Sequence, residues 1–139
     1  MAKKFKLEYE PDYDFLLFGI VSYDRDYRIS WDINQNLKFD LVRTDDHSVK
    51  LKSSEKEMHF SCFIYEDEDS YLNYKLLSNR SDEGYLLDDL KNIDYFLIIT
   101  GEYYSGLEKN IKDQLVKLES VQNCFVIESA KIKNSHRVL

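Results

Sequence analysis

Apolar and polar residues alternate along several short stretches of the chain, which is the pattern of strands with one buried face. Lys4 to Glu10 shows this alternation, as do 38–43 and 49–52. Met58 to Tyr65 and Tyr71 to Ser78 predict a hairpin whose connection is acidic. The side chains expected to face one another across this hairpin are Phe60, Cys62 and Ile64 on the first strand and Leu72, Tyr74 and Leu76 on the second.

The C-terminal half predicts a strand, a helix and a second strand. Tyr95 to Ile99 is a continuous apolar run, which is typical of a central strand buried on both faces. Ser105 and Glu108 match a capping box, and apolar residues recur at helical spacing from Leu107 to Leu118. Cys124 to Ile127 is apolar again. This order predicts a right-handed β-α-β crossover with two parallel strands.

An earlier helix is predicted to be capped by Asp24 or Asp26 and to continue to about Leu37. Phe15 to Val21 precedes it, and its apolar pattern does not distinguish a strand from a helical turn. The segment from Leu87 to Asn92 predicts a single helical turn. The residues expected to share one face of the earlier helix are Tyr27, Trp31, Asn34 and Leu37.

These elements together predict one α+β domain. We expect a mixed, mainly antiparallel sheet with two helices packed on one face and the β-α-β crossover at the C-terminal end. The chain has 139 residues, of which 43% are hydrophobic, so it is long enough to bury a core without disulfides or metals. The domain is expected to span residues 1–129, with residues 130–139 forming a loose C-terminal tail.

Charge and cysteine usage narrow the classes of partner and the compartment. The formal net charge of −7 disfavours nucleic-acid binding, which depends on neutralising phosphates. The longest apolar run, Phe15 to Val21, is too short for a membrane-spanning helix. Basic residues at the start of the chain are followed by acidic ones rather than by an apolar segment. Cys62 and Cys124 are interpreted as reduced core thiols. We therefore expect a cytoplasmic protein with no membrane association.

The segment Leu87 to Tyr95 resembles the signature of the IPExxxVDY family of small cytoplasmic proteins from Bacteroidetes-type bacteria. Ile93, Asp94 and Tyr95 stand at the VDY positions, with Ile in place of Val. Leu87-Asp88-Asp89 stands at the IPE positions and keeps only their chemical character. The resemblance extends to 15–20, to 27–34 and to the hairpin that ends at 78–79. The resemblance implies that the compartment is the cytoplasm and that the chain belongs to a class of small bacterial proteins. The family has no established activity.

Known catalytic and metal-binding patterns are absent from the sequence. The chain has three histidines, His47, His59 and His136, and no two of them have the spacing of metal ligands. Phosphate-binding loops and hydrolase or zinc-protease motifs do not occur. We therefore assign no catalytic residue, no metal site and no cofactor. Whether the protein is an enzyme stays open, and the absence of a catalytic constellation favours a protein that is not one.

One candidate binding site centres on Asp94 and Tyr95, which enter the predicted central strand. A carboxylate at that point is interpreted as accepting hydrogen bonds from backbone amides, or as pairing with Arg28 or a lysine. The functional alternative is a small-ligand pocket, or a cryptic active site, where Trp31 offers a stacking surface and Arg28 contacts an anion. Asn34 would complete this pocket together with Asp94 and Tyr95.

A second candidate is a surface rich in tyrosine and acid. The chain has 11 tyrosines, and acidic side chains outnumber basic ones between Glu66 and Asp94. Tyrosines on alternate strand positions face solvent in part, and exposed tyrosine beside carboxylates is typical of protein interfaces. The sequence therefore favours a non-enzymatic interaction module whose partner is another cytoplasmic protein, a basic one or a second copy joined through a sheet edge. The tyrosines expected to be exposed are Tyr65, Tyr71, Tyr103 and Tyr104.

Overall fold

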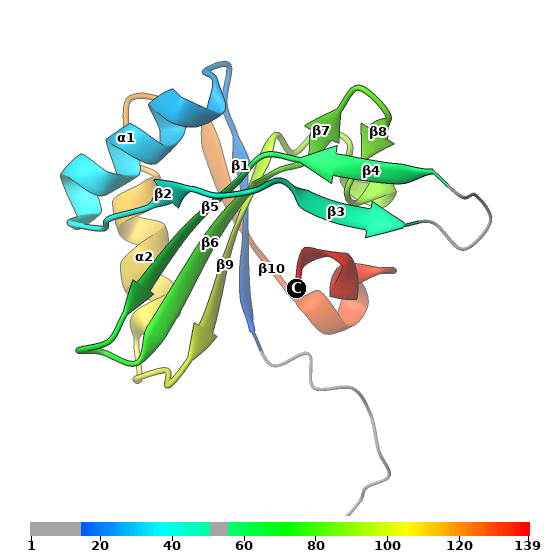
Figure 1. Ribbon diagram of the computed structural model, residues 1–139. Coiled ribbons are helices and arrows are strands. Elements are labelled where there is room, and N and C mark those ends of the chain that lie inside the picture. The colour runs from blue at the N-terminus through cyan, green and yellow to red at the C-terminus, as the bar shows by residue number, and fades with distance from the viewer. Residues whose placement is uncertain (1–14, 51–55) are drawn as a thin grey trace, which may run out of the picture.

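A six-stranded sheet runs through the centre of the molecule, with its strands in the order β10-β1-β9-β6-β5-β2 (Figure 1). The structure is a computed structural model that describes residues 15–50 and 56–139. The strand predicted at Lys4 to Glu10 lies outside these residues, and so does part of 49–52. The strands of this sheet are β1 (Leu16–Val21), β2 (Val42–Arg43), β5 (Cys62–Asp67), β6 (Leu72–Ser78), β9 (Tyr95–Gly101) and β10 (Asn123–Ile127).

Within residues 15–50 and 56–139, two small sheets and two α-helices complete the α+β fold that the sequence predicts. The helices are α1 (Asp26–Leu37) and α2 (Leu107–Leu115). None of the helices in the part of the chain that the structure describes is long and apolar enough to cross a membrane. The small sheets pair β3 (His47–Lys50) with β4 (Glu57–Phe60), and β7 (Arg80–Ser81) with β8 (Gly84–Tyr85).

The C-terminal crossover is present, but its two strands are not neighbours. β1 pairs antiparallel with both β9 and β10, so β9 and β10 run parallel to each other on either side of it. α2 connects them in sequence. Phe15 to Val21, which the sequence leaves undecided, is therefore mostly the strand β1. Its insertion between the two crossover strands is a long-range pairing, which local periodicity does not encode.

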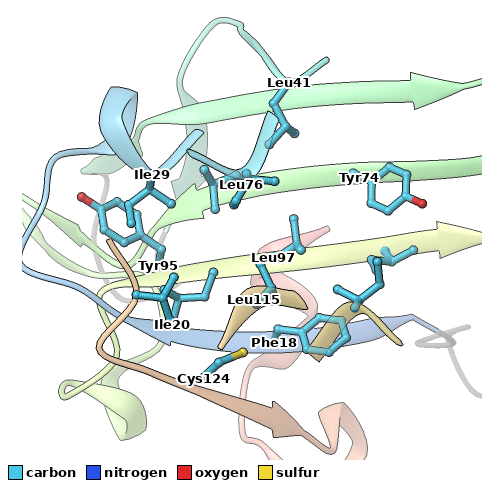
Figure 2. Packing of buried hydrophobic residues seen from close by; sticks show 14 of the residues in the cluster. Phe18, Ile20, Ile29, Leu41, Tyr74, Leu76, Tyr95, Leu97, Leu115 and Cys124 are labelled. Carbon is cyan, nitrogen blue, oxygen red and sulfur yellow. The ribbon is translucent and has the colours of Figure 1, made fainter. Parts of the chain in front are cut away.

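Each face of the sheet buries its own core. The first core lies under α1 and α2, and Figure 2 shows Phe18 and Leu97 from the sheet close to Leu115 from α2. This confirms that both helices pack on one face. The second core lies on the other face, where Phe96 and Val138 are buried. It is covered by the β3–β4 hairpin, by the segment that follows β6 and by the C-terminal segment.

α1 buries a face other than the one expected to carry Tyr27, Trp31, Asn34 and Leu37. Ile29 and Ile33 are fully buried, whereas Tyr27 and Trp31 are 65% and 52% exposed. The aliphatic pair fills the core between α1 and the sheet, which turns the aromatic side chains toward solvent. Arg25 occupies the N-cap position and makes no side-chain cap. The prediction that Asp24 or Asp26 caps this helix is therefore wrong.

α2 begins later than the capping box predicts. Its first residue is Leu107, and Gly106 is the N-cap with a φ of 92° and no side-chain cap. Because this left-handed glycine separates Ser105 from the first turn, the Ser105 hydroxyl does not cap the helix. The apolar stripe of the helix is as predicted, since Leu107, Ile111 and Leu115 are buried.

The β5–β6 hairpin is confirmed, but its predicted facing pairs are wrong. Phe63 lies opposite Leu76 and Tyr65 opposite Tyr74, on the face covered by the helices. Cys62 belongs to the other face and its core. The predicted first strand is interrupted at Ser61, between β4 and β5. A difference of one residue in register moves every side chain of a strand to the opposite face, which explains the error.

The C-terminal segment packs against the second core rather than forming the predicted loose tail. It contains the 3-10 turns η2 (Ser129–Lys131) and η3 (Ser135–Val138), and Val138 is fully buried. His47 Nε2 donates a hydrogen bond to the carbonyl oxygen of Arg137 at 2.5 Å. The Arg137 guanidinium in turn donates to the carbonyl oxygen of Leu86 at 3.4 Å. Figure 1 shows this segment on the side of the sheet away from α1 and α2.

Candidate functional site

Asp94, the residue immediately before β9, joins the end of β1 to the segment that follows β6. Its Oδ2 accepts a hydrogen bond from the backbone N–H of Ser22 at 2.9 Å, and its Oδ1 accepts one from Arg80 Nη2 at 2.6 Å. Its side chain is only 15% exposed. The predicted backbone contact is therefore present, but the cation is Arg80 and not Arg28 or a lysine. The carboxylate uses both of its oxygens to hold the fold together at this point.

Tyr95 points into the first core and reaches the loop before α1. Its hydroxyl donates a hydrogen bond to the carbonyl oxygen of Asp24 at 2.6 Å. Burial raises the pKa of Tyr95 to about 12, and the carboxylates of Asp26, Asp94 and Asp24 act in the same direction. The phenol therefore stays protonated in the physiological range, and it serves as a fixed hydrogen-bond donor between β9 and the start of α1.

A polar pocket of about 510 Å³ lies beside these two residues. We call it the Asp94 pocket. Several of its polar groups are already bonded within the protein: the Ser78 hydroxyl donates to the carbonyl oxygen of Arg80, and the Ser22 hydroxyl donates to that of Ser120. The residues that line the pocket are Val21, Ser22, Tyr23, Asp24, Ser78, Arg80, Asn92, Asp94 and Tyr95.

The other residues predicted for this site, Arg28, Trp31 and Asn34, lie elsewhere, so the prediction that they join Asp94 in one pocket is wrong. The guanidinium of Arg28 lies 5.2 Å from the Trp31 ring centre and 3.8 Å from the Glu119 carboxylate. Asn34 exchanges two hydrogen bonds with the backbone of Leu41, at 2.9 and 3.1 Å. None of Arg28, Trp31 and Asn34 lines the Asp94 pocket. The reason is the orientation of α1, which directs Asn34 toward Leu41 and turns Trp31 outward.

Asn79 holds the segment that resembles the family signature, and the sequence predicts no role for this residue. Asn79 is fully buried, and its amide group donates to the carbonyl oxygens of Leu90 and Ile93, both at 2.9 Å. Its Oδ1 accepts a hydrogen bond from the backbone N–H of Leu87 at 2.9 Å. The turn η1 (Asp88–Leu90) is thereby fixed against the sheet. A single asparagine in a polar loop gives no sequence signal for this role.

The tip of the β5–β6 hairpin forms a second hollow, of about 500 Å³, at the opposite end of β6 from the Asp94 pocket. We call it the hairpin hollow. Asp67 shapes its turn, since its carboxylate accepts hydrogen bonds from the Ser70 hydroxyl at 2.7 Å and the Asp69 N–H at 3.1 Å. Glu66 and Glu68 make no side-chain hydrogen bond or ion pair within the described residues. The residues that line the hollow are Glu66, Asp67, Glu68, Tyr71 and Asn73.

The tyrosines predicted to be exposed divide into two classes. Tyr71 is 68% exposed and Tyr104 is 52% exposed, as predicted. Tyr65 is half-buried, because its ring stacks on Tyr74 with centres 5.6 Å apart. Tyr103 is also half-buried, and its hydroxyl donates to the carbonyl oxygen of Ile99 at 2.9 Å. Tyr65 and Tyr103 are therefore less exposed than expected, because their rings pack against the first core.

The histidines are not part of a metal-binding group among the residues described. Burial lowers the pKa of His47, although its bond to the Arg137 carbonyl opposes this, and nearby Lys75 lowers it further. The Nδ1 atom of His59 is 3.0 Å from the Ser48 hydroxyl on the exposed side of the β3–β4 hairpin. No group of three His, Cys, Asp or Glu side chains in the described ranges has an arrangement that would hold a metal ion.

The two cysteines lie in different cores. Cys62 is buried on the face away from the helices, and Cys124 is buried on the face that they cover. Burial raises the pKa of the Cys124 thiol to about 11. Because the sheet separates the two thiols, they do not form a disulfide, and both are free.

No protein-family model matches this chain, and the search of curated proteins finds no match. The resemblance of the segment 87–95 to the IPExxxVDY signature therefore stays a prediction. The chemistry of the two hollows is the basis on which a function is proposed.

Proposed function

We propose that this protein is a non-enzymatic interaction module that binds a basic segment of another protein in the hairpin hollow. The observation that carries the proposal is the composition of that hollow, in which carboxylates surround an exposed tyrosine ring. Glu66 and Glu68 have no cationic partner among the described residues. A lysine or arginine side chain from a partner supplies the positive counter-charge that these carboxylates lack.

Arginine suits this hollow better than lysine does. Its planar guanidinium makes paired hydrogen bonds to a carboxylate and also stacks on an aromatic ring. Tyr71 offers such a ring beside Glu66 and Glu68, and cation–π contact adds about 0.5–1 kcal/mol at an exposed site. The net charge of −7 accelerates the approach of a basic partner and weakens that of an acidic one.

The backbone around the hollow is fixed before a partner arrives. Tyr71 adopts a φ of 59°, and its carbonyl oxygen accepts a hydrogen bond from the Glu102 N–H at 3.0 Å. Gly101 has a φ of 118°, and a Cβ at this position would collide with the Tyr71 carbonyl. Together with the turn bonds of Asp67, these contacts hold the Tyr71 backbone in one position. Less ordering is then required on binding, which favours affinity.

We also propose that the protein works in the cytoplasm. Its two cysteines are free and buried, and they lie in separate cores. Free thiols are typical of reducing compartments, whereas small secreted domains use cysteine for disulfides.

A calorimetric titration with tri-arginine tests the proposal. We expect wild-type protein to bind tri-arginine more tightly than tri-lysine, and to bind more weakly as salt is added. The double variant Glu66→Gln/Glu68→Gln should lose about tenfold in affinity, because two charge-assisted contacts disappear. The control Glu57→Gln/Glu119→Gln changes the net charge equally at exposed glutamates outside the hollow. Equal losses in both double variants would show that only overall charge matters and would refute the site.

The alternative function, a small-ligand site at the Asp94 pocket, has weaker support. The pocket has enough volume, and Arg80 and Tyr23 are exposed in it. However, Asp94, Ser22 and the Tyr95 hydroxyl already have partners in the protein. A ligand would have to compete with those bonds, whereas the hairpin hollow offers carboxylates without such bonds.

A further inference from the structure

Lys75 is a charged residue in an otherwise apolar row of the sheet. On β6 it lies directly opposite Ile64 of β5 and Ile98 of β9. Ile98 in turn lies opposite Leu17 of β1, and Leu17 opposite Ile127 of β10. Registered partners point to the same face, so this row runs across the sheet on the side away from the helices.

The ammonium group of Lys75 has no partner in the described part of the chain. The residue is half-buried, yet it makes no side-chain hydrogen bond or ion pair there. Burial lowers the pKa of Lys75, although the Cys62 thiol opposes the shift. Removing a cation from water without a counter-ion is costly, whereas an apolar residue of similar length would fill this row without that cost.

A pocket of about 350 Å³ opens beside Lys75. Ile64 and Ile98 belong to its walls, and Leu139 from the packed C-terminal segment adds a further apolar surface. Glu66 and Asn73 belong both to this pocket and to the hairpin hollow, so the two sites adjoin. The remaining wall residues are Tyr74 and Thr100.

We infer that this pocket binds a small amphiphilic carboxylate, which pairs with Lys75 and lays its apolar body against Ile64, Ile98 and Leu139. Ligand pockets of this kind have mostly apolar walls and a few charged or polar groups that orient the ligand. A single ammonium matches a single carboxylate. The Glu66 carboxylate, also on the pocket wall, disfavours ligands that carry more than one negative charge.

This inference is independent of the proposed function, because it concerns an anion at Lys75 and not a cation at Glu66 and Glu68. Failure of one therefore leaves the other standing. The test leaves Glu66 unchanged, since that residue lines both sites.

The experiment titrates the full chain with octanoate at neutral pH, followed by two-dimensional amide NMR. Octan-1-ol and octylamine serve as neutral and cationic ligands of the same chain length. We expect octanoate to shift the amide signals of Ile64, Ile98 and Leu139 and to bind more tightly than octan-1-ol. Stronger binding of octylamine than of octanoate would overturn the inference, because it would show that Glu66 dominates the pocket.

The variant Lys75→Met keeps a side chain of similar length and removes the charge. We expect it to bind octanoate at least about tenfold more weakly while it still binds octan-1-ol, which shows that the pocket remains folded. Lys117→Met, on the exposed surface after α2, is the matched control and should bind octanoate like wild type. Unchanged octanoate affinity in Lys75→Met, or no shifts at the three pocket residues in wild type, would refute the inference.

Discussion

The Asp94 pocket and the hairpin hollow lie at opposite ends of β6 and are both polar, but their polar groups are used differently. At the Asp94 end the carboxylate, the Tyr95 hydroxyl and the Ser22 hydroxyl all bond to other parts of the protein. At the hairpin end, among the residues that the structure describes, Asp67 is the only carboxylate of the hollow that makes such bonds.

This difference separates polar groups that hold the fold from those available to a partner. Two bonds at the Asp94 end, Ser22 with Asp94 and Asp24 with Tyr95, connect segments more than 70 residues apart in sequence. Bonds of Asp67 in the hairpin tip reach only two or three residues along the chain. We therefore expect substitutions at the first end to change stability, and substitutions at the second to change binding.

The largest effect is expected from Asn79→Ala. The change leaves the buried Ile93 carbonyl and the buried Leu87 N–H without their partner, while the Leu90 carbonyl keeps its bond from the Ile93 N–H, and we expect a loss of about 3 kcal/mol in the free energy of unfolding. Urea denaturation followed by circular dichroism measures it. Asn73→Ala is the matched control near the start of β6, whereas Asn79 directly follows the end of that strand; the Asn73 side chain is exposed and the change should stay within about 0.5 kcal/mol. Equal effects at both asparagines would remove the distinction between the two ends.

Asp94→Ala should cost about 2 kcal/mol, since it leaves the Ser22 N–H without its acceptor and Arg80 without its counter-ion. The same denaturation experiment measures this loss. Arg80→Gln separates the two contributions, because it breaks only the ion pair of a largely exposed arginine and should cost less than about 1 kcal/mol. If Arg80→Gln proved as harmful as Asp94→Ala, the ion pair and not the backbone contact would hold this end.

Tyr65→Ser and Tyr71→Asn compare two tyrosines of the same hairpin. Tyr65 packs on Phe39 and Tyr74, so its loss should lower the free energy of unfolding by about 1–2 kcal/mol. Tyr71 is exposed, and its backbone is in the left-handed region, which asparagine tolerates. Tyr71→Asn should therefore leave the free energy of unfolding unchanged and weaken tri-arginine binding. Thermal unfolding and calorimetry together check both expectations. Binding that is unchanged in Tyr71→Asn would exclude the ring from the site.

The smallest effect is expected from the pH dependence of His47, which lies at neither end. Burial lowers the pKa of His47 in the folded state below 6.5, its ordinary value. The unfolded chain therefore binds a proton more readily, and the stability linked to His47 is complete above pH 6.5 and declines as pH falls through the lowered pKa. Denaturation of wild type and His47→Gln across this range measures it. The wild-type free energy of unfolding should fall more steeply; parallel curves would contradict the assignment.

Local patterns in the sequence account for much of the fold. The buried strand from Tyr95, the apolar stripe from Leu107 and the hairpin that ends at Ser78 are all found. These features depend on residues close together in the chain. The position of β1 between β9 and β10 depends on pairing between distant segments, and no local pattern encodes it.

The sequence predicts less of the candidate sites than of the fold. Asp94 and Tyr95 do line a pocket, but their partners Arg80, Ser22 and Asp24 are distant in sequence and left no signal. The buried face of α1 is encoded locally, because Ile29 and Ile33 form an aliphatic pair at helical spacing that marks it.

The most direct test is one NMR titration with tri-arginine that follows the hollows at both ends of β6. The amide signals of Glu66, Glu68 and Tyr71 report on the hairpin hollow, and those of Ser78 and Asp94 report on the Asp94 pocket. The account predicts saturable shifts at the hairpin hollow that added salt weakens, with the Asp94 pocket unchanged. Shifts centred on the Asp94 pocket, or none at the hairpin hollow, would contradict it.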